Sequence, residues 1–162
     1  MPNKEKTFSK SELLAVASPD TGGDDKIRFG SAINRWVERG ALKVSNADDG
    51  ARKHRRYDVG QAMIAAIGLY FYNLGFTPEN IEALFAQLQT ELDQPSPGLE
   101  DALMSNVVSC PTEFTYYPSA GHWHVETEQR DFGRAFRGGM EPAQIIIDLV
   151  PRFAKLRAAL EE

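Results

Sequence analysis

The sequence predicts an α+β fold, mainly helical with small β elements, for a chain of 162 residues. Three observations support this class. Apolar side chains recur at helical spacing in several segments, residues that cap helices stand directly before these segments, and short alternating segments lie between turn-rich breaks. A chain of this length is long enough for one sizeable domain or two small ones.

The first helix is predicted over residues 10–17, after a short extended entry. Ser9 is followed three residues later by Glu12, which is the spacing of a capping box. Residues 18–25 are dense in Pro, Gly and Asp, so they are predicted to break the chain before the next helix.

A second helix is predicted over about residues 29–39 and ends at Gly40. Its apolar stripe consists of Ile33, Trp36 and Val37. Residues 41–45 and 53–57 are predicted to be the two strands of a hairpin, because the segment between them, 46–50, is rich in turn formers.

Two further helices are predicted from their caps. Asp58 precedes a segment, 59–73, that is apolar nearly all round, and such a helix is usually central and buried. Thr77 is predicted to cap the fourth helix, with Pro78 at the first position, where a missing amide hydrogen does no harm. The apolar stripe of this helix consists of Ile81, Leu84, Phe85, Leu88 and Leu92.

The segment at residues 94–98 contains two prolines and a glycine and is the predicted linker. It divides the chain into an N-terminal domain, residues 1–93, and a small C-terminal α/β-hairpin region, residues 99–162. A short helix is predicted near residues 99–108.

Two strands and a last helix are predicted in the C-terminal region. The strands cover residues 113–117 and 122–128, and the helix covers about 143–160, with Pro151 expected to kink or split it. The apolar stripe of this helix consists of Ile146, Leu149, Val150, Phe153, Leu156 and Leu160. Because such a stripe needs a partner surface, the region is expected to serve in dimerisation, in effector sensing, or in both.

Charge is divided unevenly along the chain. The net charge is −5, but residues 1–57 contain 12 Lys and Arg against 8 Asp and Glu, a net of +4, whereas residues 58–162 carry −9. A run of basic and potentially basic residues occupies positions 52–56. A cationic loop held between ordered elements suits the phosphate backbone of DNA. The alternative is a solvated charged loop.

The order of the predicted elements is that of a winged helix-turn-helix: an extended entry, two helices, a two-stranded wing and two more helices. Three segments, 35–42, 54–59 and 74–84, carry a resemblance to the MerR family of transcription regulators. The first resembles the end of the family's second helix, the second its Arg-x-Tyr wing, and the third its Leu-Gly-Phe-Thr junction. The resemblance extends over about residues 7–92.

The resemblance implies a homodimer that binds double-stranded DNA through the second helix and the wing. Three features depart from the family pattern. Residues 18–26 look inserted between the first two helices, and Asn34, Arg35 and Trp36 stand where the family often has Arg-Tyr-Tyr, so the sequence preference is expected to differ. Pro95 and Pro97 shorten the helix that in the family pairs with its twin. A dimer of this chain is therefore expected to be built differently.

Candidate DNA contacts follow from this arrangement. Asn34 is suited to adenine, and Arg35 and Arg39 to guanine or phosphate. Trp36 belongs to the apolar stripe and is expected in the core, while Tyr57 either donates to a phosphate or packs against the third helix. Side chains alternate along a strand, and the family pattern favours Arg55 over Arg56 for DNA. The full set is Lys10, Ser11, Ser31, Asn34, Arg35, Arg39, Arg52, Lys53, His54, Arg55, Arg56 and Tyr57.

A second constellation lies on the predicted strand at 122–128. His122, His124, Glu126 and Glu128 alternate with Trp123, Val125 and Thr127. Two histidines with a carboxylate beyond them, joined by Cys110, are able to bind a divalent metal, which would suit a metal-sensing regulator. The alternative, an ordinary polar strand face, is favoured, so no metal site is assigned.

Aromatic residues gather in the C-terminal region: Tyr116, Tyr117, Trp123, Phe132 and Phe136. They are numerous enough to line a pocket for a small apolar effector. They are also enough to fill the core of a small domain, and this second interpretation is favoured.

Several classes of protein are excluded by absent sequence features. No apolar run is long enough to span a bilayer, the N-terminus lacks a signal-peptide core, and the only cysteine excludes an internal disulfide, so a cytoplasmic, nucleoid-associated protein is expected. No Ser-His-Asp order, phosphate-cradling glycine loop or paired-cysteine motif is present. The chain is therefore not expected to be an enzyme or to need a cofactor.

The function predicted from the sequence is sequence-specific binding of duplex DNA by a MerR-like transcription regulator. Its two-fold symmetry predicts a palindromic site. The alternative is a DNA-bending or recombination accessory protein, or a phage-type DNA-binding protein without an inducer. Protection of one short palindrome indicates a regulator, whereas bending of many sites indicates an architectural protein.

Overall fold

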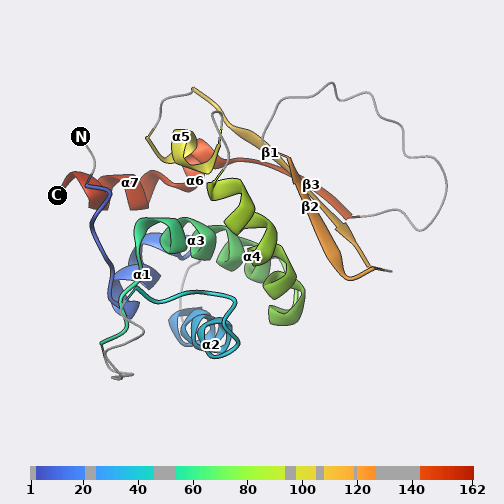
Figure 1. The fold of residues 1–162 in the computed structure, drawn as a ribbon, viewed down its shortest axis with the longest axis horizontal. Coiled ribbons are helices and arrows are strands. Elements are labelled where there is room, and N and C mark those ends of the chain that lie inside the picture. The colour runs from blue at the N-terminus through green and yellow to red at the C-terminus, as the bar shows by residue number, and fades with distance from the viewer. Residues whose placement is uncertain are drawn as a thin grey trace.

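The computed structural model describes residues 3–20, 25–45, 54–93, 98–104, 108–118, 120–126 and 143–162. Within these ranges the chain forms seven helices and one three-stranded antiparallel sheet, so the predicted α+β class is confirmed (Figure 1). Among the helices of these ranges, none is long and apolar enough to cross a membrane.

Helix α3 (Val59–Asn73) lies at the centre of the N-terminal half of the chain. It contacts α1 (Lys10–Ala17), α2 (Asp25–Glu38) and α4 (Pro78–Leu92). Its side chains are buried nearly all round, as its uninterrupted apolar sequence predicts. The other three helices therefore have a common apolar surface against which to pack (Figure 1).

The predicted boundaries of α1, α3 and α4 are confirmed because their caps form. Ser9 and Glu12 make both hydrogen bonds of the capping box at the start of α1. Asp58 accepts from the backbone N–H of Gln61 at 2.8 Å, and Thr77 caps α4 in the same way.

Helix α2 begins at Asp25, four residues before the predicted start. Asp25 places a carboxylate in the first turn, where the helix dipole favours a negative charge. Its Oδ1 lies 3.3 Å from Arg28 Nη2, at the i, i+3 spacing that stabilises a helix. The extra turn adds Lys26, Ile27 and Arg28 to the helix surface.

The sheet has strand order β2-β1-β3 and packs one face on the helices. Its strands are β1 (Pro111–Tyr117), β2 (His122–Glu126) and β3 (Ala143–Asp148). The rings of Phe114 and Trp123 lie 4.9 and 5.1 Å from that of Phe71 in α3, and Trp123 Nε1 donates to Asn80 O of α4 at 2.7 Å. The predicted inward direction of Trp123 is confirmed.

The predicted helix over residues 143–160 is wrong in its first part, because residues 143–148 form β3. Three consecutive isoleucines favour a strand, since their β-branched side chains fit a pleated surface. Ile145 pairs with Phe114 and Ile147 with Thr112 across the ladder to β1. Ile146, which was assigned to the helical stripe, lies on the other face and is 45 % exposed.

The chain continues from β3 into two short helices, α6 (Leu149–Arg152) and α7 (Ala154–Glu161). The predicted helix is divided after Arg152 and not at Pro151. Pro151 lies in the first turn of α6, where its missing N–H is not needed. Helix α7 packs on α1 and on α5 (Leu99–Met104). The predicted stripe therefore finds much of its partner surface within the same chain. Its buried residues are Leu149, Phe153, Leu156 and Leu160.

One hydrophobic cluster contains residues from both sides of the predicted linker, including Phe71 of α3, Leu103 of α5 and Leu156 of α7. The N-terminal helices and the C-terminal region thus bury apolar area against each other. This packing holds α1 between α3 and α7.

Gly68 of α3 lies directly against Phe85 of α4, and we expect Gly68→Ala to destabilise the protein. An added Cβ lies 2.4 Å from Phe85 Cε1, whose ring is itself packed 4.9 Å from that of Trp36. Overpacking costs about 1–3 kcal/mol, and the gain in helix propensity returns about 1 kcal/mol. A net loss of about 1 kcal/mol in the free energy of unfolding is expected from urea titration.

Gly60→Ala is the matched control, because Gly60 lies in the same helix. Its added Cβ meets the end of the half-buried Leu92 side chain at 3.1 Å, which is able to move, and Asp58 Oδ1 at 3.3 Å. This variant is expected to be as stable as the wild type or slightly more stable. Equal stability of the two variants would contradict the close contact at Gly68.

Candidate nucleic-acid interface

Helix α2 is fixed in place through its inner face. Trp36 is fully buried, as predicted, and its Nε1 donates to Pro78 O at 3.2 Å. Its ring packs edge-to-face on Phe85 of α4 and on Tyr72 of α3, with centroid distances of 4.9 and 6.3 Å. At Gly30, the side chains of Lys10 and Leu14 in α1 approach the helix closely. These contacts hold the opposite face of α2 outward.

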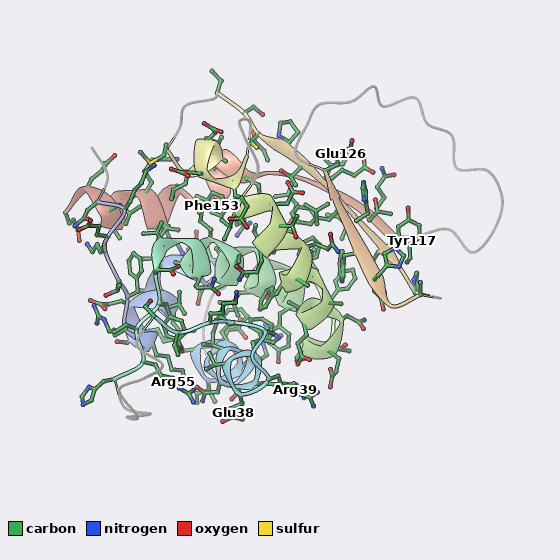
Figure 2. The ribbon with its side chains drawn as sticks, viewed as in Figure 1. Glu38, Arg39, Arg55, Tyr117, Glu126 and Phe153 are labelled. Carbon is green, nitrogen blue, oxygen red and sulfur yellow. The ribbon has the colours of Figure 1, made fainter. Side chains whose placement is uncertain are left out.

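Four residues at a spacing of four, three and four positions make up this outer face: Ile27, Ser31, Asn34 and Glu38. We call them the α2 outer stripe. Ile27 is 81 % exposed, Ser31 and Glu38 are exposed, and Asn34 is half-buried. Figure 2 shows Glu38, Arg39 and Arg55 at the lower edge of the molecule.

The arginines beside the outer stripe are engaged by carboxylates of α4. Arg35 forms ion pairs with Glu79 and Glu82, and Arg39 Nε lies 3.6 Å from Glu82 Oε1. A hydrogen bond from its own backbone N–H lowers the pKa of Glu79 most strongly. Desolvation opposes this effect, and the charge of Arg35 lowers the pKa further. Sequence reasoning missed these pairings, because α2 and α4 are distant in the chain.

The segment after α2 is not the predicted strand over residues 41–45. Gly40 adopts a positive φ of 73°, and the N–H groups of Ala41 and Leu42 donate to Trp36 O instead of to a second strand. Lys43 N–H donates to the side-chain Oε1 of Gln61 at 2.9 Å. The backbone donors of this segment are thus used by the end of α2 and by α3.

The return part of the predicted hairpin differs as well. The turn at 46–50 and residues Arg52 and Lys53 lie outside the described residues. Of the described part, Ser45 N–H donates to Arg56 O at 2.8 Å, but the bridge of Tyr57 is to Phe8 at the entry to α1. The segment that enters α1 therefore takes the place that the hairpin partner was expected to occupy.

Tyr57 packs in the core, which decides between the two predicted roles. Its side chain is fully buried. Burial raises the pKa of its hydroxyl, and the positive charge of Arg55 opposes part of this rise. The Tyr57 hydroxyl is therefore not placed to donate to a phosphate.

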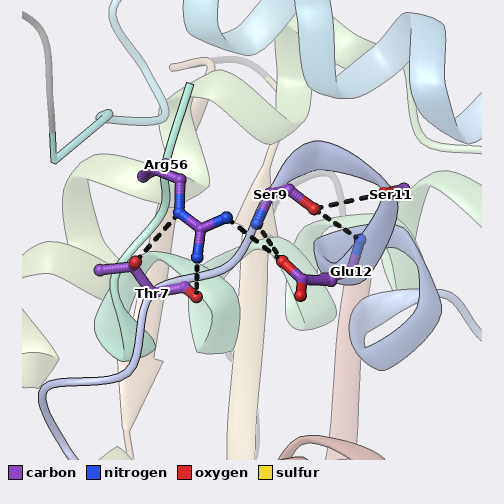
Figure 3. A network of polar contacts seen from close by, with 5 residues as sticks. All are labelled: Thr7, Ser9, Ser11, Glu12 and Arg56. Carbon is purple, nitrogen blue, oxygen red and sulfur yellow. Dashed lines mark hydrogen bonds and ion pairs between the residues drawn. The ribbon is translucent and has the colours of Figure 1, made fainter. Parts of the chain in front are cut away.

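Arg56 joins the base of the loop to the start of α1, as Figure 3 shows. Its Nη2 donates to Thr7 O at 2.7 Å, its Nε to Thr7 Oγ1 at 3.1 Å, and its Nη1 lies 3.4 Å from Glu12 Oε2. Hydrogen bonds from Ser9 lower the pKa of Glu12, and Arg56 lowers it further. The predicted DNA contact at Arg56 is thus occupied by the protein's own polar groups.

The remaining predicted contacts lie at two places. Lys10 and Ser11 begin α1, where Ser11 is exposed and Lys10 is half-buried over Gly30 of α2. His54 is exposed and Arg55 half-buried just before Tyr57. The Phe8–Tyr57 bridge connects these two places, because Phe8 precedes α1 and Tyr57 follows Arg55.

Of the candidate metal ligands on the sheet, Glu128 lies outside the described residues. Residues 122, 124 and 126 lie on the face opposite Trp123, but the His122 ring stacks on Tyr117 and His124 lies beside Glu126 at 3.8 Å. Cys110 is buried, and burial raises the pKa of its thiol. Among the described residues no group of three or more candidate ligands is brought together.

Of the five aromatic residues that the sequence assigned to a core or a pocket, Trp123 is buried in the core and Tyr116 packs against it, whereas Tyr117 stacks on His122 outside the core cluster. Tyr116 and Trp123 pack against Phe76 at centroid distances of 6.0 and 5.1 Å, and Phe132 and Phe136 lie outside the described residues. A cleft of about 220 Å³ lies elsewhere, between the end of α1 and helices α6 and α7. At its rim Lys155 pairs with Asp20.

Comparison with known proteins gives no identification. No protein-family model matches the chain, and a search of curated proteins finds no similar sequence.

Proposed function

We propose that the chain is a duplex DNA-binding protein that uses α1 and α2 as a helix-turn-helix and the segment before Tyr57 as the base of a wing. One observation carries the proposal. The outer stripe of α2 is held outward by the buried Trp36, and Glu38 of this stripe and Arg55 lie at the same edge of the molecule (Figure 2). A recognition helix needs an outward polar face, and a wing needs a cation beside it.

Within this class, the particular function that we propose is a MerR-like transcription regulator. The resemblance over residues 7–92 supports it. Asn34 in the outer stripe is suited to the paired donor and acceptor of adenine. Lys10 and Ser11 at the start of α1 are suited to phosphates, because the first N–H groups of a helix and its dipole favour an anion.

The proposed regulator is a homodimer, and a monomeric DNA-binding protein is the alternative to it. The C-terminal stripe that suggested a dimer surface is buried largely within the same chain, against α1 and α5. This observation favours a second candidate, a DNA-bending or recombination accessory protein that binds as a monomer. The two candidates differ in the symmetry of the DNA site that they require.

Salt dependence of duplex binding tests the class. About 4–6 phosphate contacts give a log–log slope of about −4 to −5, so affinity is expected to fall about 250- to 1000-fold between 50 and 200 mM salt. Absence of duplex binding, or binding that does not change with salt, contradicts the proposal.

Selection of bound duplexes from a random library then tests the particular function, with Asn34→Ala in parallel. Enrichment of a palindrome by the wild type supports a dimeric regulator, and a single asymmetric site or bending without enrichment supports the accessory protein. Asn34→Ala is expected to lose about 1–3 kcal/mol of discrimination at an adenine. Because the Asn34 side chain is half-buried at the surface of α2, the unfolding midpoint of Asn34→Ala is expected to equal that of the wild type. A loss of discrimination in this variant is then an effect on base contact and not on folding.

A further inference from the structure

The α2 outer stripe contains an apolar side chain that the fold leaves to solvent. Ile27 is 81 % exposed and lies in the first turn of α2, one turn before Ser31 and two before Asn34. Ile33 of the same helix is fully buried, so the helix has an apolar inner face and, separately, this single outward isoleucine. Leaving Ile27 in water forgoes the stabilisation that burial of its side chain would supply.

Three arginines in α2 and at the residue after it are directed to other groups of the protein, whereas Lys26, next to Ile27, is exposed. Arg28 donates to Asn73 Oδ1 at 3.0 Å, pairs with Asp25, and lies over the Tyr72 ring. Further along the helix, Arg35 and Arg39 pair with Glu79 and Glu82. Arg28, Arg35 and Arg39 are therefore held beside the outer stripe by other groups of the protein. Ile27, the first residue of the stripe, presents only apolar surface to solvent.

Position along the helix distinguishes Ile27 from Glu38, the acidic member at the other end of the stripe. In a helix-turn-helix, the N-terminal residues of the recognition helix contact base edges. Ile27 and Ser31 lie in the first two turns of α2, Asn34 lies in the third turn, and Glu38 is its last residue. The acidic side chain is thus placed farthest from the bases.

We propose that Ile27 contacts the C5-methyl group of a thymine in the DNA site and makes the protein specific for it. The major groove presents one apolar group to a protein, the thymine methyl, and aliphatic side chains pack against it. Asn34 on the same stripe reads an adenine by hydrogen bonds, so the stripe combines an apolar and a polar contact. This inference rests on the proposed function, because it requires α2 to be the recognition helix.

Replacement of single thymines by deoxyuridine tests it, because this change removes only the methyl group. The duplex is the site enriched by library selection, and the full-length protein is used. Removal of the methyl group at one thymine is expected to weaken wild-type binding about fourfold, and removal at that thymine and at its symmetric mate in a palindrome about 16-fold. Ile27→Ala is expected to bind the thymine duplex at least fourfold more weakly and to bind the thymine and deoxyuridine duplexes equally.

Val108→Ala is the matched control variant. Val108 is also apolar and β-branched, is 99 % exposed, and lies between α5 and β1. It is expected to keep the wild-type ratio of thymine to deoxyuridine affinity. Both substitutions are made at exposed side chains, so the unfolding midpoints are expected to equal that of the wild type.

The outcomes separate the inference from the function on which it rests. Duplex binding with the same thymine-to-deoxyuridine ratio in the wild type and Ile27→Ala overturns the inference and leaves the proposed function standing. Absence of any duplex binding by the wild type overturns both. A ratio that falls to one in Ile27→Ala and persists in Val108→Ala supports the inference.

Discussion

Replacing Trp36 with alanine is expected to lower the free energy of unfolding by about 3–5 kcal/mol. The indole is fully buried between α2, α3 and α4, where it packs on Phe85 and Tyr72. Its removal leaves a cavity at the point where three helices meet and leaves Pro78 O without its donor. The midpoint of urea unfolding, with the slope held common, measures the loss.

Trp36→Phe separates packing from hydrogen bonding at the same position. Phenylalanine keeps an aromatic ring against Phe85 but lacks the N–H that donates to Pro78 O. A loss of about 1–2 kcal/mol is expected for this variant. A loss below about 1 kcal/mol in Trp36→Ala would show that Trp36 does not hold α2 in place, and the outward direction of the outer stripe would lose its explanation.

Arg56→Ala is expected to destabilise the protein by about 1–2 kcal/mol, whereas Arg55→Ala, which removes a charge beside the Tyr57 hydroxyl, is expected to cost less. Arg56 donates twice to Thr7 and pairs with Glu12, so its removal weakens the junction between the loop and α1 (Figure 3). The pair with Glu12 is partly exposed and contributes least. Thermal unfolding of both variants measures the difference.

Arg55→Ala is expected to have the larger effect on DNA binding, although Arg56→Ala has the larger effect on stability. Under the proposed function, Arg55→Ala loses a phosphate contact, so the log–log salt slope is expected to become shallower by about 0.9. Arg56→Ala is expected to keep the slope at temperatures where it is folded. If both variants make the slope shallower by the same amount, Arg56 also contacts a phosphate, and its hydrogen bonds to Thr7 do not keep it from DNA.

The helices that the sequence predicted accurately are those with complete local signals. For α1, α3 and α4, a cap residue, a first-turn partner and an apolar pattern all lie within the same segment. Asp58 bonds Gln61, and Ser9 bonds Glu12, without help from distant parts of the chain. For α2, residues 18–25 read as one break, and the start at Asp25 was missed.

The errors concern segments whose structure depends on distant partners. Residues 143–148 carry a pattern that fits either a helix or a strand, and pairing with β1 decides for the strand. Residues 41–45 alternate as a strand does, but the end of α2 and Gln61 take up their backbone donors. Tyr57 pairs with Phe8, 49 positions earlier in the chain.

In the candidate site, too, the sequence predicted what depends on local spacing and missed what depends on distant partners. Helical spacing alone was sufficient to assign Trp36 to the core and to place Asn34 and Arg35 off the apolar stripe. The sequence did not indicate that Arg35 is held by Glu79, that Arg56 is held by Thr7, or that Ile27 is left to solvent. Each of these facts requires the position of a second element.

By itself the sequence determined the mixed class, the capped helices and the basic character of the first 57 residues, because these depend on neighbouring side chains and on composition. Only the tertiary structure decided which cations face outward, which strand completes the sheet and where the C-terminal stripe is buried. The physical reason is that an ion pair or a strand ladder forms between segments brought together by the burial of apolar surface. Local spacing carries no information about which distant segment will be the partner.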